Sequence, residues 1–118
     1  CTRNVERDTR ALKRLLSARS KSATTILLYH TPDLMPKITG LGIDLYLTGH
    51  THGGQLRLPL YGALFTSSRW GKRYEMGRYE AQGTTLYVSR GLGLEGLGAP
   101  RARFLAPPEL VQWTLHGP

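Results

Sequence analysis

The residues whose types and spacing could do chemistry lie at positions 49–55, which read Gly-His-Thr-His-Gly-Gly-Gln. His50 and His52 are one residue apart, so in an extended segment their side chains would share a face and point into one small volume. Neutral imidazole is a common metal ligand, and such a pair suits one shared ion or two neighbouring ions. The flanking glycines would allow positive φ and a close backbone approach to a ligand. The alternative interpretation is a surface turn that carries two solvated histidines.

A third histidine follows another apolar run upstream. Residues 23–29 and 43–48 are both typical of strands, and the first is apolar enough to be buried on both faces. His30 ends the first run, and ligands of α/β sheets bind beyond the carboxyl ends of the strands. Two parallel neighbouring strands would therefore bring His30 close to His50 and His52. Alone, His30 would be interpreted as a structural residue, but the three together predict a metal site at one edge of a sheet.

Helices are expected on either side of the first strand. Residues 5–19 have leucines near helical spacing, and Asp8 is the expected N-cap of this amphipathic helix. Pro32 should stop the first strand, and Asp33 should cap a short helix over residues 34–39. These elements predict a strand–helix–strand unit of an α/β fold.

The chain after the histidines is expected to be richer in loops. Residues 56–60 suggest a weak edge strand because they contain a proline. Residues 61–78 combine cations with aromatic side chains, which suits either a loop that covers a substrate or an ordinary surface loop. Residues 79–82 and 84–89 predict a hairpin around Gly83, in a second sheet packed on the first.

Residues 91–96 match the letters of the dinucleotide-binding pattern G-x-G-x-x-G. Gly-Ala-Pro follows shortly after, where that pattern needs a helix, so we interpret the stretch as a loop near the rim of the site. Arg90 just before it is a candidate contact for a substrate phosphate. Closing strands are expected over residues 102–105 and 110–115, and His116 should be solvated.

Composition bounds the range of partners. The chain has 118 residues, enough for one domain at most, and a formal net charge of +8, which suits anionic partners such as phosphate esters, nucleic acid or acidic lipid. A nonenzymatic basic module that binds nucleic acid or an anionic membrane is therefore an alternative to a metal site. One cysteine excludes an internal disulfide, and no apolar stretch is long enough to suggest a membrane span or a signal peptide. A chain that opens Cys-Thr-Arg-Asn without Met looks cut or processed.

Two motifs together resemble a known family. Leu-Tyr-His-Thr-Pro-Asp at residues 28–33, combined with the histidine motif at residues 49–55, is similar to the C-terminal half of calcineurin-like metallophosphoesterases. The run at residues 84–93, with the later Arg-Phe and Pro-Pro-Glu-Leu, resembles the YkuE/YaeI-like branch of bacterial phosphodiesterases, several of which are tied to the cell envelope. The resemblance extends over essentially the whole chain.

The resemblance implies an α/β fold, with residues 1–118 forming the C-terminal half of a two-sheet sandwich flanked by helices. By the same resemblance His30 and His50 would bind one divalent ion, and His52 a second, with Mn, Fe or Zn all suitable. The intact enzyme would hydrolyse a phosphodiester or pyrophosphate bond through a metal-activated hydroxide. A lipid-linked or cell-wall phosphate is a candidate substrate, and the location stays open between the cytoplasm and the membrane or envelope.

The family motifs Asp-x-His, Gly-Asp-x-x-Asp and Gly-Asn-His-Asp/Glu are not present in these residues. The chain is therefore expected to be a fragment that lacks the carboxylate ligands and is inactive alone. Its expected partners are the missing N-terminal half of the same domain and, because sheet edge and apolar surface would be exposed, a second copy of itself.

Overall fold

The computed structural model describes residues 4–66, 68–94 and 101–116. One long helix, α1 (Val5–Ser17), begins the chain, and a second, α2 (Met35–Ile38), continues a 3₁₀ helix at Pro32–Leu34. The strands are β1 (Ile26–Leu28), β2 (Leu45–Thr48), β3 (Arg57–Leu58), β4 (Gly62–Ala63), β5 (Gly77–Ala81) and β6 (Thr84–Val88). Two further 3₁₀ helices lie at His52–Gly54 and Gly71–Tyr74.

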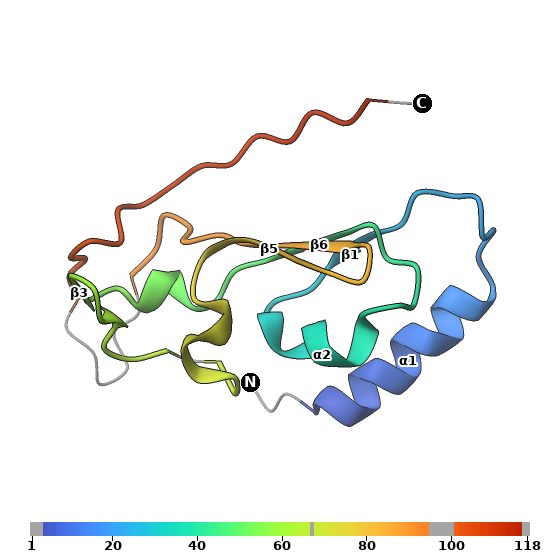
Figure 1. Cartoon of the computed structure of the whole chain (residues 1–118), viewed down its shortest axis with the longest axis horizontal. Coiled ribbons are helices and arrows are strands. Elements are labelled where there is room, and N and C mark those ends of the chain that lie inside the picture. Colours follow the sequence, from blue (N-terminus) through green and yellow to red (C-terminus); the bar gives the residue numbers. More distant parts are fainter. Residues whose placement is uncertain (1–3, 67, 95–100, 117–118) are drawn as a thin grey trace.

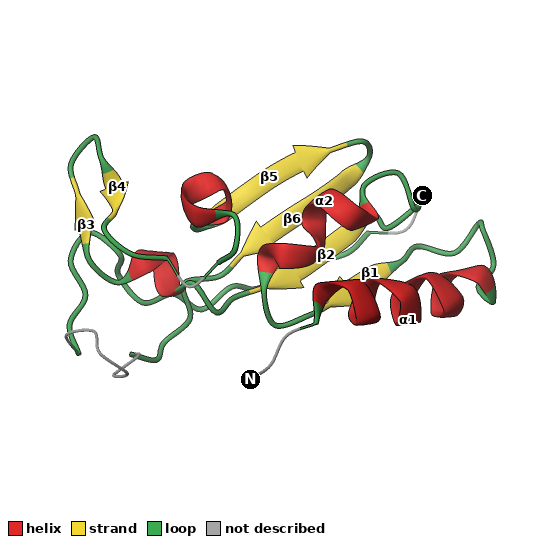
Figure 2. Ribbon diagram, turned by 90° about the horizontal axis from the view of Figure 1, so that it is seen from below, coloured by secondary structure: helices red, strands yellow, loops and turns green. Residues whose placement is uncertain are grey.

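A four-stranded mixed sheet with strand order β1-β2-β6-β5 organises the molecule. β2 is parallel to both β1 and β6, whereas β5 and β6 pair antiparallel through the hairpin predicted around Gly83. Helices α1 and α2 lie on one face of this sheet, and the C-terminal segment runs past the other (Figure 1). The separate β3–β4 hairpin projects at one end of the molecule (Figure 2). The mixed α/β class expected from the sequence is confirmed, and so is the parallel pairing of the first two strands.

The hydrophobic core lies between the sheet and the helices. Its fully buried members come from α2, β2, β6 and the adjoining loops, and include Met35, Ile38, Tyr46, Leu86 and Val88. The Tyr46 hydroxyl donates a hydrogen bond to a buried backbone carbonyl of the loop after β1, so a polar atom inside the core is satisfied. Burial raises the pKa of the Tyr46 phenol, which stays neutral.

Both predicted N-caps are wrong. The Asn4 side chain, rather than Asp8, caps α1 by accepting a hydrogen bond from the backbone N–H of Arg7 at 3.0 Å. Asp8 lies inside the helix and accepts a 2.6 Å hydrogen bond from the Tyr29 hydroxyl. The helix begins at Val5, the first residue of the predicted range, and Asn4 is therefore the residue in the capping position.

Thr31 caps the 3₁₀ helix in place of Asp33, through its hydroxyl and the backbone N–H two residues on. The Asp33 carboxylate is buried and instead accepts hydrogen bonds from the Ser68 hydroxyl at 2.9 Å and the Arg69 backbone N–H at 3.0 Å. The Trp70 indole donates to the Asp33 carbonyl at 3.1 Å. The loop at residues 68–70 is thereby attached to the loop that follows β1, a long-range contact that no local pattern encodes.

Three further expectations are wrong. β1 is not buried on both faces: Leu28 is 74% exposed, because β1 is an edge strand and no described residue covers its outer face. The hairpin β5–β6 joins the same sheet as β2 instead of a second sheet. Residues 102–105 and 110–115 are not closing strands; an isolated bridge between Leu56 and Phe104 is the one pairing there among the described residues. Alternation alone cannot form a strand without a partner ladder. His116 is exposed, as predicted.

Among residues 4–66, 68–94 and 101–116, we find no helix with the length and apolar character that crossing a bilayer requires.

Candidate functional site at the histidine loop

His30 and His50 lie at the carboxyl ends of two adjacent parallel strands. The parallel ladder of β1 and β2 continues one step beyond the strands, since the Gly49 N–H donates to the His30 carbonyl at 3.4 Å. The two imidazole rings consequently meet with their centroids 4.6 Å apart and their planes tilted by 53°. His30 is exposed and His50 is half-buried, so a ligand could reach both from solvent. This juxtaposition is the one that the strand pattern predicts.

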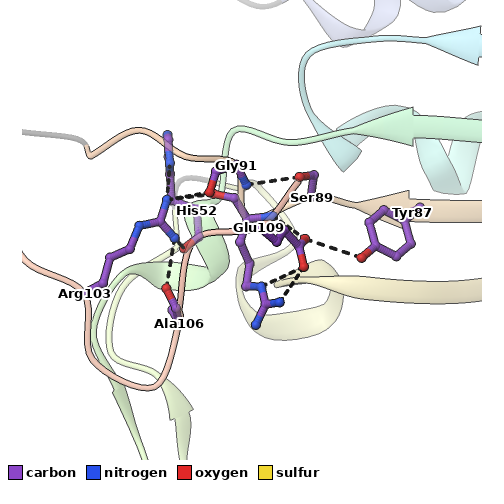
Figure 3. A network of polar contacts seen from close by, with 8 residues as sticks. His52, Tyr87, Ser89, Gly91, Arg103, Ala106 and Glu109 are labelled. Atoms are coloured by element: carbon purple, nitrogen blue, oxygen red, sulfur yellow. Dashed lines mark hydrogen bonds and ion pairs between the residues drawn. The ribbon is translucent and has the colours of Figure 1, made fainter. Parts of the chain in front are cut away.

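His52 is held by a different group of residues, shown in Figure 3. Its Nδ1 lies 3.4 Å from the Nη2 of Arg103, a side chain 51 positions further along the chain. The Arg103 guanidinium also donates to the backbone carbonyls of Arg90 at 2.9 Å, Gly91 at 3.1 Å and Gly93 at 2.5 Å. Burial, and then the neighbouring Arg90 charge, lower the pKa of Arg103. Arg103 thus connects the histidine loop to the loop that follows β6.

The backbone of the loop is strained at the histidines themselves. His50 has φ +68° and His52 has φ +50°, a left-handed region that residues with a Cβ rarely adopt. Such strained residues cluster at ligand-binding sites, where the surrounding structure holds them in place. Buried Thr51, between them, provides part of that support by donating its hydroxyl to the Glu75 carbonyl at 2.6 Å.

A charged pair attaches the β3–β4 hairpin to the same loop. The Arg57 guanidinium donates to the Gly53 carbonyl at 3.0 Å and pairs with the Glu75 carboxylate at 2.5 Å. The other Glu75 oxygen accepts from the Ala63 N–H at 3.3 Å. Gly54 packs so closely on β4 that a Cβ there would lie 2.2 Å from the Cβ of Ala63. The hairpin and the histidine loop therefore form one tightly packed unit.

Arg90, the predicted phosphate contact, lies beside Gly53 of this loop and is paired with Glu109. The Glu109 carboxylate accepts from the Arg90 backbone N–H at 2.8 Å and from its guanidinium at 3.0 and 2.5 Å. Burial by itself would raise the pKa of Glu109, but the hydrogen bonds and charge of Arg90 outweigh it, and the pKa is lowered. Burial and then the Glu109 charge raise the pKa of the nearby Tyr87 phenol. A substrate phosphate would have to share Arg90 with Glu109.

The residue types at the site suit a divalent ion, although the described residues do not complete a coordination sphere. Two imidazoles that meet at an accessible edge are suitable borderline ligands for Mn, Fe or Zn. In the part of the chain that the structure describes, no group of three or more His, Cys, Asp or Glu side chains is arranged to hold a metal. The structure brings together His30 and His50 and leaves His52 with Arg103, and the role of each as a ligand stays a prediction.

Glu109 and Arg103 are the residues near the site whose contacts sequence reasoning missed. Both belong to motifs that carry the family resemblance, Arg-Phe and Pro-Pro-Glu-Leu. The motifs single out these two positions but do not predict which residues they contact. Their partners lie 19 and 51 residues away, and only folding brings them together.

The mixed α/β fold is consistent with a fragment of a metallophosphoesterase, the class of protein to which the sequence comparisons find similarity. The chain is related to several bacterial members, and the resemblance predicted from its motifs is confirmed. The uncharacterized metallophosphoesterase YkuE of Bacillus subtilis is 46% identical over 100 residues, which cover 85% of this chain and 34% of YkuE. No protein-family model and no solved structure matches the chain.

Two further relatives carry more specific names. The phosphodiesterase YaeI of Escherichia coli is 41% identical over 68 residues, covering 58% of this chain and 25% of YaeI. The UDP-2,3-diacylglucosamine pyrophosphatase LpxG of Chlamydia trachomatis is 34% identical over 92 residues, covering 72% of this chain and 27% of LpxG. The chain thus spans about a third or less of the length of these relatives.

Proposed function

We propose that the intact protein is a metal-dependent phosphoesterase that cleaves a phosphodiester or pyrophosphate bond. The observation that carries the proposal is the meeting of His30 and His50, with ring centroids 4.6 Å apart, at the carboxyl ends of two parallel strands. Relatives named as a phosphodiesterase and as a pyrophosphatase support the substrate class. LpxG acts, by its name, on a diacylated sugar nucleotide. By analogy, we propose a lipid-linked phosphate as a candidate substrate of this protein.

His30 and His50 would hold one divalent ion, and His52 would serve a neighbouring ion. Divalent ions bound there would neutralise charge on the phosphate and lower the pKa of a water molecule to near neutrality. Imidazoles are neutral ligands, so the site would keep its positive charge for the anionic substrate. Arg90 would add a cation beside the phosphate, with Glu109 holding its guanidinium in a defined orientation.

This chain alone is expected to be inactive, because no three His, Cys, Asp or Glu side chains among its described residues are grouped to hold a metal. Two-metal sites that hydrolyse phosphate esters need ligands to bridge and anchor both ions. We infer that the remaining ligands come from the part of a longer polypeptide that corresponds to the rest of its relatives. That part would also cover the exposed outer face of β1.

The test measures metal content and hydrolysis of bis(p-nitrophenyl) phosphate by the intact protein. His50→Ala should lower Mn²⁺ affinity by about tenfold or more and abolish hydrolysis, and EDTA should inhibit the unmodified protein until Mn²⁺ is restored. His116→Ala is the matched control, because this histidine is exposed and belongs to the C-terminal segment, whose end lies away from the histidine loop (Figure 1). Unchanged metal content and hydrolysis in His50→Ala would overturn the proposal.

The alternative of a nonenzymatic basic module makes the opposite prediction. Binding to a DNA duplex through Arg and Lys would fall steeply with salt concentration and would be indifferent to EDTA and to His50→Ala. Such binding without metal-dependent hydrolysis would favour the alternative.

A further inference from the structure

The β3–β4 hairpin and the two residues that follow it present apolar side chains to solvent over residues 58–65, with Leu60 and Tyr61 at the hairpin tip. Its exposed members are Leu58, Leu60, Tyr61, Leu64 and Phe65, and Leu60 is fully exposed. The hairpin projects from one end of the molecule, away from the four-stranded sheet (Figure 2). Single exposed apolar residues are ordinary on protein surfaces, but five within eight residues of one protrusion mark an interaction surface.

Cations accompany this apolar tip. The ammonium of Lys72 lies 3.0 Å from the centroid of the Tyr61 ring and donates to the Tyr61 carbonyl at 2.9 Å. Exposed Arg73 follows Lys72 directly in the 3₁₀ helix at Gly71–Tyr74. Residues 45–74 contain no acidic side chain at all, although the chain holds eight in total. The surface therefore combines leucine and aromatic side chains with the positive charge of Lys72.

We propose that the hairpin tip docks into the interface of a lipid bilayer that contains anionic lipid. Leucine and phenylalanine side chains gain free energy by leaving water for the boundary of the acyl chains, and tyrosine suits the headgroup level. The Lys72 ammonium beside them is attracted to anionic headgroups. Nucleic acid suits the tip less well, because its outermost side chain is an aliphatic leucine that can neither stack on a base nor contact a phosphate.

The base of the hairpin is attached to the histidine loop, so docking of the tip would also position that loop. Arg57 connects β3 to the Gly53 carbonyl of the histidine loop, and Gly54 packs against β4. A tip inserted in the interface would therefore hold His50 and His52 at a constant orientation to the headgroups. This consequence rests on the proposed phosphoesterase function, whereas the docking does not.

The test is co-sedimentation of the intact protein with vesicles of phosphatidylcholine, with and without phosphatidylglycerol, in EDTA and without substrate. Binding should be stronger to the phosphatidylglycerol vesicles and should weaken as salt rises. Leu60→Asp should reduce that binding by about tenfold or more, because it replaces an apolar side chain that would insert into the bilayer interface with a negatively charged one. Aspartate tolerates the positive φ of this position, and nothing packs on the side chain, so folding should be preserved.

Leu110→Asp is the matched control, since Leu110 is 89% exposed and receives the same substitution away from the hairpin. It should leave vesicle binding unchanged. Lys72→Gln should reduce binding to phosphatidylglycerol vesicles about fivefold while changing binding to phosphatidylcholine little.

Three results would overturn the docking proposal. Equal vesicle binding by the unmodified protein and Leu60→Asp would exclude the tip. Protection of the Leu60 and Tyr61 side chains from hydroxyl-radical labelling in the absence of vesicles would mean that another part of the polypeptide, or a second copy, covers the tip. Binding to a DNA duplex that Leu60→Asp abolishes, without vesicle binding, would assign the surface to nucleic acid. Because this test does not measure hydrolysis, its result is independent of the proposed enzymatic function. The protein could bind vesicles without being a phosphoesterase, or be a phosphoesterase without binding vesicles.

Discussion

The close packing of Gly54 against β4 predicts a severe effect of adding one methyl group. An alanine at this position would adopt φ +78°, which costs a residue with a Cβ about 1–2 kcal/mol. Its Cβ would lie 2.2 Å from the Cβ of Ala63 and 2.8 Å from the Phe65 carbonyl oxygen, and relieving such overlap costs about 1–3 kcal/mol. Lower entropy of the unfolded chain offsets roughly 0.4–1 kcal/mol of this. Gly54→Ala should therefore lower the free energy of unfolding by about 1–4.6 kcal/mol.

Urea unfolding of the intact protein measures this change, and Gly83→Ala separates its two causes. Gly83 has a similar φ of +81°, but a Cβ there would meet nothing within 4 Å. Gly83→Ala should consequently show the backbone cost alone, about 1 kcal/mol. The double variant Gly54→Ala/Ala63→Gly removes the closest overlap and should recover part of the loss. An equal effect of the two single variants would refute the inference that the hairpin packs tightly on the histidine loop.

Three other changes test the contacts around the site. Glu109→Gln should lower the free energy of unfolding by about 1–2 kcal/mol at neutral pH. Because the folded pKa of Glu109 is lowered, its contribution is present above the ordinary glutamate pKa of about 4.3 and is lost as pH falls through the folded value. Urea unfolding measured across pH should therefore show the stabilities of the two proteins converging in acid. Tyr46→Phe should cost about 1–2 kcal/mol in the same assay, because a buried carbonyl loses its donor; an unchanged midpoint would contradict the buried hydrogen bond. Arg103→Lys should lower Mn²⁺ affinity by about tenfold in titration calorimetry, because lysine cannot reach the carbonyls and His52 together, and unaltered affinity would leave Arg103 without a positioning role.

In this site, the residues that hold the histidine loop in place are different from the histidines that are predicted to bind metal. The histidine pair depends on the parallel ladder of β1 and β2, which is formed by backbone hydrogen bonds and needs no special side chain. The strained loop that carries His50 and His52 instead depends on long side chains from elsewhere, chiefly Arg57 and Arg103. Side chains that hold a ligand-bearing loop in this way commonly orient metal ligands. Changes in these arginines should therefore alter ligand geometry before they alter the fold.

Local sequence determined the elements that carry the histidines. The apolar runs before His30 and His50 formed strands in parallel register, and a helix formed over the leucine pattern that begins the chain. These features depend on periodicity and on backbone hydrogen bonds between neighbouring strands, which short segments encode directly. The meeting of His30 and His50 follows from them, because parallel strands of one sheet end at the same edge.

Only the tertiary structure decided which distant side chains complete the loop. The pairs Arg103–His52 and Arg57–Glu75 join residues that no local pattern relates, since each depends on how separate segments pack. The same reason explains why the β5–β6 hairpin joined the first sheet, and why the alternating residues 110–115 formed no strand. A strand needs a free edge beside it, and a cap or an ion pair needs a partner brought within hydrogen-bond distance. Both are properties of the folded chain as a whole, because packing sets them and residue type alone does not.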